Sequence, residues 1–174
     1  MNETQWKGNP KVFKSYLHWK PDQDNPKSGK SVNDSSFEEA AKHSCFGAVL
    51  NDDFIDISFD TEELSDIFWK MAEGNNWNCL ILENTENGHI HSFWKKPESW
   101  KQSDGKDKTL AVGLIADIHS GKTRIIMRVN GNDRFPPSFE PDEIQEVPSE
   151  LFPVDSDISL YDLGEGDGRN QGAG

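Results

Sequence analysis

Residues 54–73 read FIDISFDTEELSDIFWKMAE and join a strand pattern directly to a helix pattern. Up to Phe59, apolar and polar residues alternate with the two-residue period of a half-buried strand. After Thr61 the apolar residues recur at helical spacing, two glutamates occupy the first turn, and Gly74 follows the last turn. This stretch therefore predicts a strand followed at once by an amphipathic helix.

Further strand patterns lie on both sides of this unit. They cover residues 12–19, 46–50, 79–83, 89–96, 110–119 and 124–129. A capping-box spacing predicts a second, short helix over about residues 35–43. Turn-forming residues at 51–53, 87–88 and 120–121 predict three β-hairpins. Paired strands interleaved with two helices predict an α+β fold, with a largely antiparallel sheet of ferredoxin-like or RNA-recognition-like (RRM-like) order and helices on one face.

The chain has 174 residues, of which 33% are hydrophobic, and six Trp and ten Phe supply much of the apolar area that a core needs. No apolar run approaches the roughly 18 residues of a membrane span, and the N-terminus lacks the pattern of a secretory signal. We therefore expect a cytoplasmic protein with no membrane partner. Cys45 and Cys79 are isolated in apolar stretches, which predicts two core thiols.

The net charge of −13 disfavours a nucleic-acid partner, because phosphate binding needs positive surface. The acidity is unevenly distributed, since residues 135–168 contain ten acids and no Lys or Arg, and residues 1–134 carry a net charge of only −4. This contrast predicts a domain over residues 1–138 and an acidic, Pro- and Gly-rich tail or linker over residues 139–174.

Carboxylates recur on one face of the predicted strand 54–60, where the two-residue period aligns Asp56, Ser58 and Asp60. Asp117 interrupts a later apolar strand and needs a partner, a metal ion or exposure to water. Such oxygen ligands suit Mg²⁺ or Mn²⁺, so Asp56, Asp60 and Asp117 are candidate metal ligands. The alternative is a half-buried edge strand whose polar face meets water.

Histidines and basic residues follow these carboxylates along the chain. His89 and His91 project to the same side of a predicted strand, although such a pair is only half of a metal site and often just hydrogen-bonds to neighbours. Four cationic side chains near Asp117 could bind phosphates or simply be solvated: Lys122, Arg124, Arg128 and Arg134. The basic loop 95–108 is a candidate path for a DNA backbone, with Lys95, Lys96 and Lys101 as contacts.

Three motifs occur in a fixed order within residues 12–135. Residues 55–58 (IDIS) form a hydrophobic and acidic strand motif, residues 85–94 (TENGHIHSFW) contain Thr-x-x-Gly-x-x-His before aromatic residues, and residues 115–121 (IADIHSG) place an Asp before a Gly turn. This order resembles the primase–polymerase family, the archaeo-eukaryotic primase superfamily as found in phages and mobile elements. The second motif is the most specific of the three.

The resemblance implies an RNA-recognition-like catalytic core joined to a small N-terminal α/β unit, and a DNA primase or polymerase that transfers nucleotides with two Mg²⁺ or Mn²⁺ ions. By this likeness Asp56 and Asp117 hold metal, His91 contacts the phosphates of the incoming nucleoside triphosphate, and Lys122 and Arg124 neutralise them. His89 is a further candidate phosphate contact. The expected partners are DNA template and primer, nucleoside triphosphates, and a helicase domain or replication protein reached through the acidic C-terminal segment.

One position departs from the family pattern, because Ser58 stands where the first motif has its second carboxylate. If Asp60 does not replace that carboxylate, the site lacks one acid for two-metal transfer. A catalytically weak or inactive module that binds single-stranded DNA is therefore the first alternative.

His89-Ile-His91 also resembles the His-hydrophobic-His motif of rolling-circle replication endonucleases. That chemistry needs a Tyr nucleophile, and neither of the two tyrosines lies in a Tyr-x-x-x-Lys helix. A third alternative is an α+β domain whose motifs match by chance.

Overall fold

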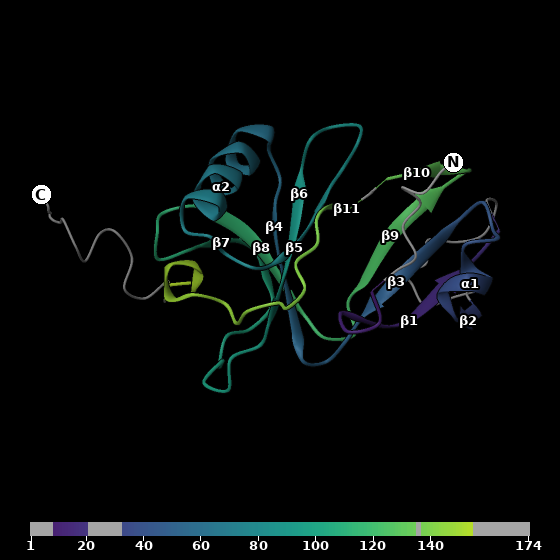
Figure 1. The fold of residues 1–174 in the computed structure, drawn as a ribbon, viewed down its shortest axis with the longest axis horizontal. Helices are drawn as coiled ribbons and strands as arrows, with labels where there is room; N and C mark the ends of the chain where they lie inside the picture. The colour runs from purple at the N-terminus through teal and green to yellow at the C-terminus, as the bar shows by residue number, and fades with distance from the viewer. Residues whose placement is uncertain (1–8, 21–32, 135–136, 155–174) are drawn as a thin grey trace, which may run out of the picture.

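The computed structural model describes residues 9–20, 33–134 and 137–154, which form two antiparallel sheets and two helices (Figure 1). The first sheet has the order β10-β9-β3-β1-β2 and the second the order β11-β5-β6-β4-β8-β7. The first sheet contains β1 (Phe13–His18), β2 (Asn33–Ser35), β3 (Phe46–Leu50), β9 (Arg124–Val129) and β10 (Asn132–Asp133). The second contains β4 (Phe54–Phe59), β5 (Leu80–Glu83), β6 (Ile90–Lys95), β7 (Gly105–Thr109), β8 (Ile115–Ser120) and β11 (Pro137–Phe139). The prediction of an α+β, largely antiparallel fold is confirmed.

The strand and helix of residues 54–73 form the centre of the second sheet. Helix α2 (Glu62–Gly74) begins after Thr61, whose Oγ1 accepts a hydrogen bond from the Leu64 backbone N–H at 3.0 Å. Strand β5 follows α2 in the chain but does not pair with β4, because β6 lies between the two strands and pairs with both. This is the split β-α-β arrangement of ferredoxin-like folds. The second helix of that pattern is not formed in residues 96–114, where the chain makes β7 instead.

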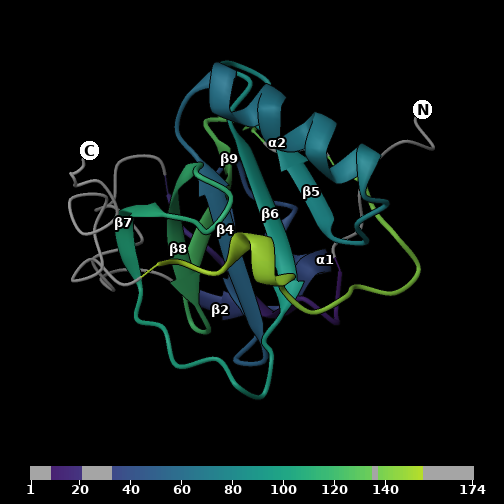
Figure 2. The same ribbon diagram turned by 90° about the vertical axis from the view of Figure 1, so that its left-hand side faces the viewer.

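Alternation along β4 divides the second sheet into two faces. Ile55, Ile57 and Phe59 share a core with α2, in which Phe68 stacks on Phe59 at 4.8 Å between ring centroids. On the other face Phe54 joins a core with residues of the first sheet. Figure 2 shows α2 in front of the second sheet and the first sheet behind it. Asp56 and Ser58 therefore face the first sheet.

At two of the three predicted hairpins the chain does not reverse direction. Instead, two neighbouring antiparallel segments continue together from one sheet into the other. The hairpin of β5 and β6 is confirmed, with Gly88 at a φ of +75°. By contrast, β3 pairs with β9 and β4 pairs with β8, so the chain passes from the first sheet to the second at Asp52 and returns at Gly121. The two bends touch, because a Cβ on Gly121 would overlap the Asp52 backbone. The turn residues there bend paired strands and do not reverse the chain.

The smaller α/β unit consists of the first sheet and helix α1 (Phe37–Ala40), which packs against β1. This helix is shorter than predicted and begins after Ser36, whose Oγ accepts a hydrogen bond from the Glu39 backbone N–H at 3.2 Å. Cys45 and Cys79 are free and buried, as predicted. None of the helices in the described ranges is long and apolar enough to cross a membrane.

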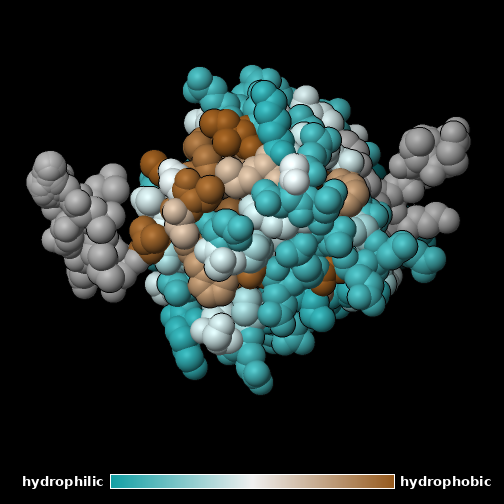
Figure 3. Space-filling view, turned by 60° about the vertical axis from the view of Figure 1, so that its left-hand side comes forward, coloured by the Kyte–Doolittle hydropathy of each residue, from teal (hydrophilic) through white to brown (hydrophobic). Residues whose placement is uncertain are grey.

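Part of the predicted acidic tail belongs to the compact domain. Strand β11 pairs with β5, and Val147 and Leu151 are buried in the core beneath α2. The described part of the chain ends shortly after a 3-10 turn at Ser149–Leu151, and buried residues of 139–154, which the sequence analysis assigned to a tail, pack with the second sheet and its core. The remaining predicted tail, 155–174, lies outside the described residues. The surface on this side is mostly hydrophilic but carries one area where apolar side chains gather (Figure 3).

Candidate functional site

The register of the second sheet brings the predicted site residues to one face. In the antiparallel ladders Ser58 lies opposite His91 on β6 and opposite Asp117 on β8, and Asp56 lies opposite His119. Residues directly opposite one another in a ladder project to the same face. Asp56, His91 and Asp117 therefore lie on the same side of the sheet, facing the first sheet.

Asp56 and His91 form a closely paired unit. The Asp56 Oδ2 and Oδ1 atoms lie 2.8 Å and 3.0 Å from the His91 Nδ1 atom. The Asp56 side chain is 1% exposed and that of His91 is 23% exposed. Because a carboxylate accepts hydrogen bonds, Nδ1 of His91 donates to it, and this contact fixes the orientation of the imidazole ring. A buried carboxylate thus positions a half-buried imidazole.

A cavity of about 420 Å³ opens beside this pair. Its walls come from the second sheet, from the bend at Gly121 and from β9, and they include Asp56, His91, His119, Lys122, Thr123, Arg124, Ile125, Ile126 and Arg134. Among the described residues of its wall are three cationic side chains and one carboxylate, which is hydrogen-bonded to a histidine. This volume lies within the range of small-molecule sites, and the charge favours an anionic ligand.

A group of three carboxylates lies at the other end of the polar row. Oxygen atoms of Asp60, Asp107 and Asp117 all lie within 4.8 Å of one another. Asp117 is buried, and its Oδ1 accepts a hydrogen bond from the Asp107 backbone N–H at 2.9 Å. Burial raises the pKa of Asp60, and the nearby charges of Asp117 and Asp107 add to this effect while Lys106 opposes it. A hard divalent cation would relieve the repulsion, and the oxygen donors fit Mg²⁺ or Mn²⁺.

The structure divides the predicted metal ligands between two places. Asp60 and Asp117 come together, but with Asp107, and the Asp56 carboxylate is not part of that group. Lys122 and Arg124 line the cavity, whereas His89, Lys95, Lys96 and Lys101 do not. Arg128 bonds to Asp133 and to backbone carbonyls of the smaller unit instead.

Two site residues were not singled out from the sequence. His119 lies two residues after Asp117 on β8, so the strand period could have assigned it to the same face. No pattern in the sequence indicated that Asp107 belongs to a site, because it lies among lysines in a segment predicted as a surface loop.

We expect Asp60→Asn to stabilise the protein at pH 7 in the presence of a chelator. The folded-state pKa of Asp60 is raised, so this carboxyl favours the fold at low pH, and that contribution is lost as the pH rises through the raised pKa. The gain should stay below about 1 kcal/mol because the side chain is exposed. Thermal unfolding in EDTA at pH 4 and pH 7 tests this, with exposed Asp66→Asn on α2 as control. A larger gain at pH 4 than at pH 7 would contradict it.

No family model matches this chain, and no curated protein matches it significantly. The cavity, the Asp56–His91 pair and the carboxylate group are therefore the basis on which a function is inferred.

Proposed function

We propose that the protein binds a nucleoside triphosphate in the cavity between its two sheets and transfers nucleotides to DNA, as primase–polymerases of phages and mobile elements do. The observation that carries this proposal is the meeting of Asp56 and His91, from two motifs 35 residues apart, in one cavity with Lys122, Arg124 and Arg134. A chance match of motifs does not require them to meet in this way.

The charges around the cavity suit a triphosphate. Arg124 and Arg134 can each make paired hydrogen bonds to phosphate oxygens, and Lys122 supplies a point charge. Lys122 has a φ of +75° at the Gly121 bend, so the backbone there has the left-handed turn conformation. In the proposed complex His91, oriented by Asp56, contacts the phosphate chain, and the cationic residues hold it in line for transfer.

Divalent cations complete the proposed site. Asp60, Asp107 and Asp117 are the residues that would hold one, because their oxygens are close together and repel one another without it. Asp56 is the carboxylate among the described residues of the cavity wall and is the candidate ligand for a second ion. Bound metal would lower the pKa of the attacking hydroxyl and neutralise negative charge that develops on the leaving pyrophosphate.

Primer extension and de novo priming with labelled nucleotides, each in Mg²⁺ and in Mn²⁺, test the proposal. We expect wild-type protein to incorporate label in at least one metal and Lys122→Ala to raise the nucleotide KM, because a contact to the phosphates is lost in the ground state as well as in the transition state. The exposed Lys70→Ala on α2 is the matched control. Absence of incorporation by wild type in both metals would remove the catalytic claim.

A second candidate function is binding of single-stranded DNA or nucleotide without transfer. The position of Ser58 favours it, because this buried hydroxyl lies between His91 and Asp117, where the family motif supplies a carboxylate. This alternative predicts that fluorescence anisotropy detects DNA binding that is unchanged by EDTA and by Asp56→Asn. The nucleotidyl-transfer proposal predicts that both treatments abolish incorporation.

A further inference from the structure

A second group of metal-ligating side chains lies in the smaller α/β unit, apart from the cavity. His18 is the last residue of β1, Glu39 belongs to α1, and His43 follows that helix. We infer that His18, Glu39 and His43 form a binding site for a transition-metal ion of the Zn²⁺ type.

The three side chains are already gathered. The rings of His18 and His43 stack with centroids 3.7 Å apart and planes inclined by 6°, and the His43 Nε2 atom lies 3.4 Å from the Glu39 Oε2 atom. One possible ligand atom from each residue lies within 4.8 Å of the other two. Zn–N bonds of about 2.0–2.1 Å place donor atoms about 3.3 Å apart in a tetrahedral site. To bind one ion the two rings must leave the parallel stack and tilt until both ring planes meet at the metal, and His43 and Glu39 have room to move because they are 37% and 51% exposed.

The backbone that carries these ligands is held on both sides. Arg128 Nη1 donates hydrogen bonds to the carbonyls of Ala41, at 2.7 Å, and His43, at 3.1 Å. The Arg128 guanidinium lies 4.8 Å from the centre of the Phe46 ring, and Phe46 is the β3 residue opposite His18. One arginine thus connects the segment that supplies His43 to β3, the strand that pairs with the end of β1, and this reduces the entropy lost when a metal orders the ligands.

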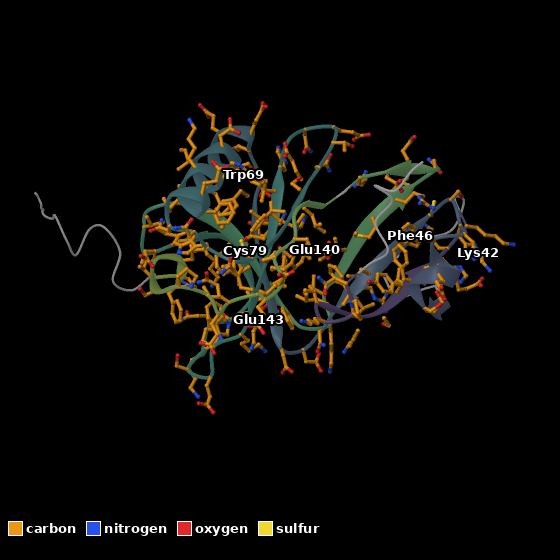
Figure 4. The ribbon with its side chains drawn as sticks, in the orientation of Figure 1. Lys42, Phe46, Trp69, Cys79, Glu140 and Glu143 are labelled. Atoms are coloured by element: carbon orange, nitrogen blue, oxygen red, sulfur yellow. The ribbon has the colours of Figure 1, made fainter. Side chains whose placement is uncertain are left out.

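The donor set indicates which metal would bind. Two imidazoles and one carboxylate are the ligands of many zinc sites with an open fourth position, whereas Mg²⁺ and Ca²⁺ prefer oxygen donors. Lys42 Nζ lies 3.7 Å from the Glu39 Oε1 atom but is 73% exposed, and its side chain extends away from the fold in Figure 4. It can move aside when a cation arrives.

A metal ion here would tie the segment after α1 to the end of β1, which otherwise meet through the stacked rings. The ion would therefore act on the stability of the smaller unit, and the cavity between the sheets does not depend on it. The acidic group Asp60, Asp107 and Asp117 prefers hard cations. Excess Mg²⁺ therefore occupies that group, and added Zn²⁺ then reports on the histidine site.

The full chain is freed of metal with a chelator, dialysed into excess Mg²⁺ and titrated with Zn²⁺ by calorimetry. We expect one tight site, a rise in Tm with Zn²⁺, and binding about 100-fold weaker in His43→Gln and Glu39→Gln, because even residues behind the ligands commonly contribute 10–100-fold. Co²⁺ should give visible absorption bands that both substitutions remove. His89→Gln, at a histidine outside both sites, is the matched control.

Several results would overturn the site. The first is that wild type binds no Zn²⁺ tightly, and the second is that wild type and His43→Gln bind Zn²⁺ with equal affinity. The third is that His91→Gln loses binding while His43→Gln keeps it. Circular dichroism of each variant checks the fold. Because Glu39 and His43 are partly exposed, their substitution tests binding even if His18→Gln fails to fold.

Discussion

The Asp56→Asn variant should incorporate nucleotides at least about 100-fold more slowly than wild type while keeping its fold. Asparagine has nearly the same shape, and its amide oxygen still accepts a hydrogen bond from His91 Nδ1. The substitution removes the buried negative charge, which is the feature that would bind metal and stabilise the orientation of His91, and it replaces one of the two oxygens near Nδ1 with an amide NH2 group. Loss of one preorganised electrostatic contact commonly costs 10²–10³ in rate. Primer extension at saturating nucleotide and Mn²⁺ measures the effect.

Two controls make this result specific. Asp66→Asn removes an exposed carboxylate from α2 and should leave incorporation unchanged. Thermal unfolding shows whether Asp56→Asn remains folded at the assay temperature. A folded Asp56→Asn protein that retains wild-type rate within about twofold would show that the Asp56–His91 pair takes no part in transfer, and the proposed mechanism would fail.

Local periodicity predicted the central unit well. The alternation at 54–59 correctly gave the two faces of β4, and Thr61 correctly began α2, because these properties depend on neighbouring residues alone. The bends at Asp52 and Gly121 were read as hairpins, since a turn signal gives a change of chain direction but not the partner of each strand. The division into two sheets depends on pairing between β3 and β9 and between β4 and β8, which are distant in sequence.

The candidate site was predictable only where residues share a strand or a motif. Asp56 and His91 were identified from motif spacing, and the cross-strand register brings them together. The partners of Asp60 and Asp117 could not be foreseen, because Asp107 reaches them through an irregular register of β7 against β8. The grouping of His18 with His43 likewise arises from packing of α1 on β1, which no local pattern predicts.

Composition did not indicate that part of the C-terminal stretch packs into the core, because acidic residues dominate that stretch. Val147 and the pair Leu151-Phe152 are apolar residues of a stretch rich in acids and prolines and show no period, yet Val147 and Leu151 are 5% and 0% exposed. An extended segment that crosses a core needs only an occasional apolar side chain, since hydrogen bonds to neighbouring strands satisfy its backbone N–H and C=O groups. Such bonds join Lys95 to Gln145 and Val147, and Thr109 to Val154.

Removal of residues 139–174 should therefore unfold the protein, whereas a chain that ends at residue 154 keeps the buried segment and should still fold. The longer deletion exposes the core that Val147 and Leu151 cover, a loss of about 1.5–3 kcal/mol for each side chain, from a total stability of about 5–15 kcal/mol. It also removes the partner of the Lys95 backbone N–H and the carbonyls that bond to Ala111 and Val112.

Far-UV circular dichroism and thermal unfolding of the two truncated chains, with full-length Leu151→Ala as a graded intermediate, measure this effect. Leu151→Ala should cost about 2–5 kcal/mol, because its site is closed on all sides and cannot collapse fully around the smaller side chain. A chain ending at residue 138 that unfolds cooperatively at the full-length Tm would show that the C-terminal segment only lies against the domain. The expected order of stability is full length, then Leu151→Ala, then the chain ending at 138, and the chain ending at 154 should still fold because it retains Val147, Leu151 and their backbone hydrogen bonds.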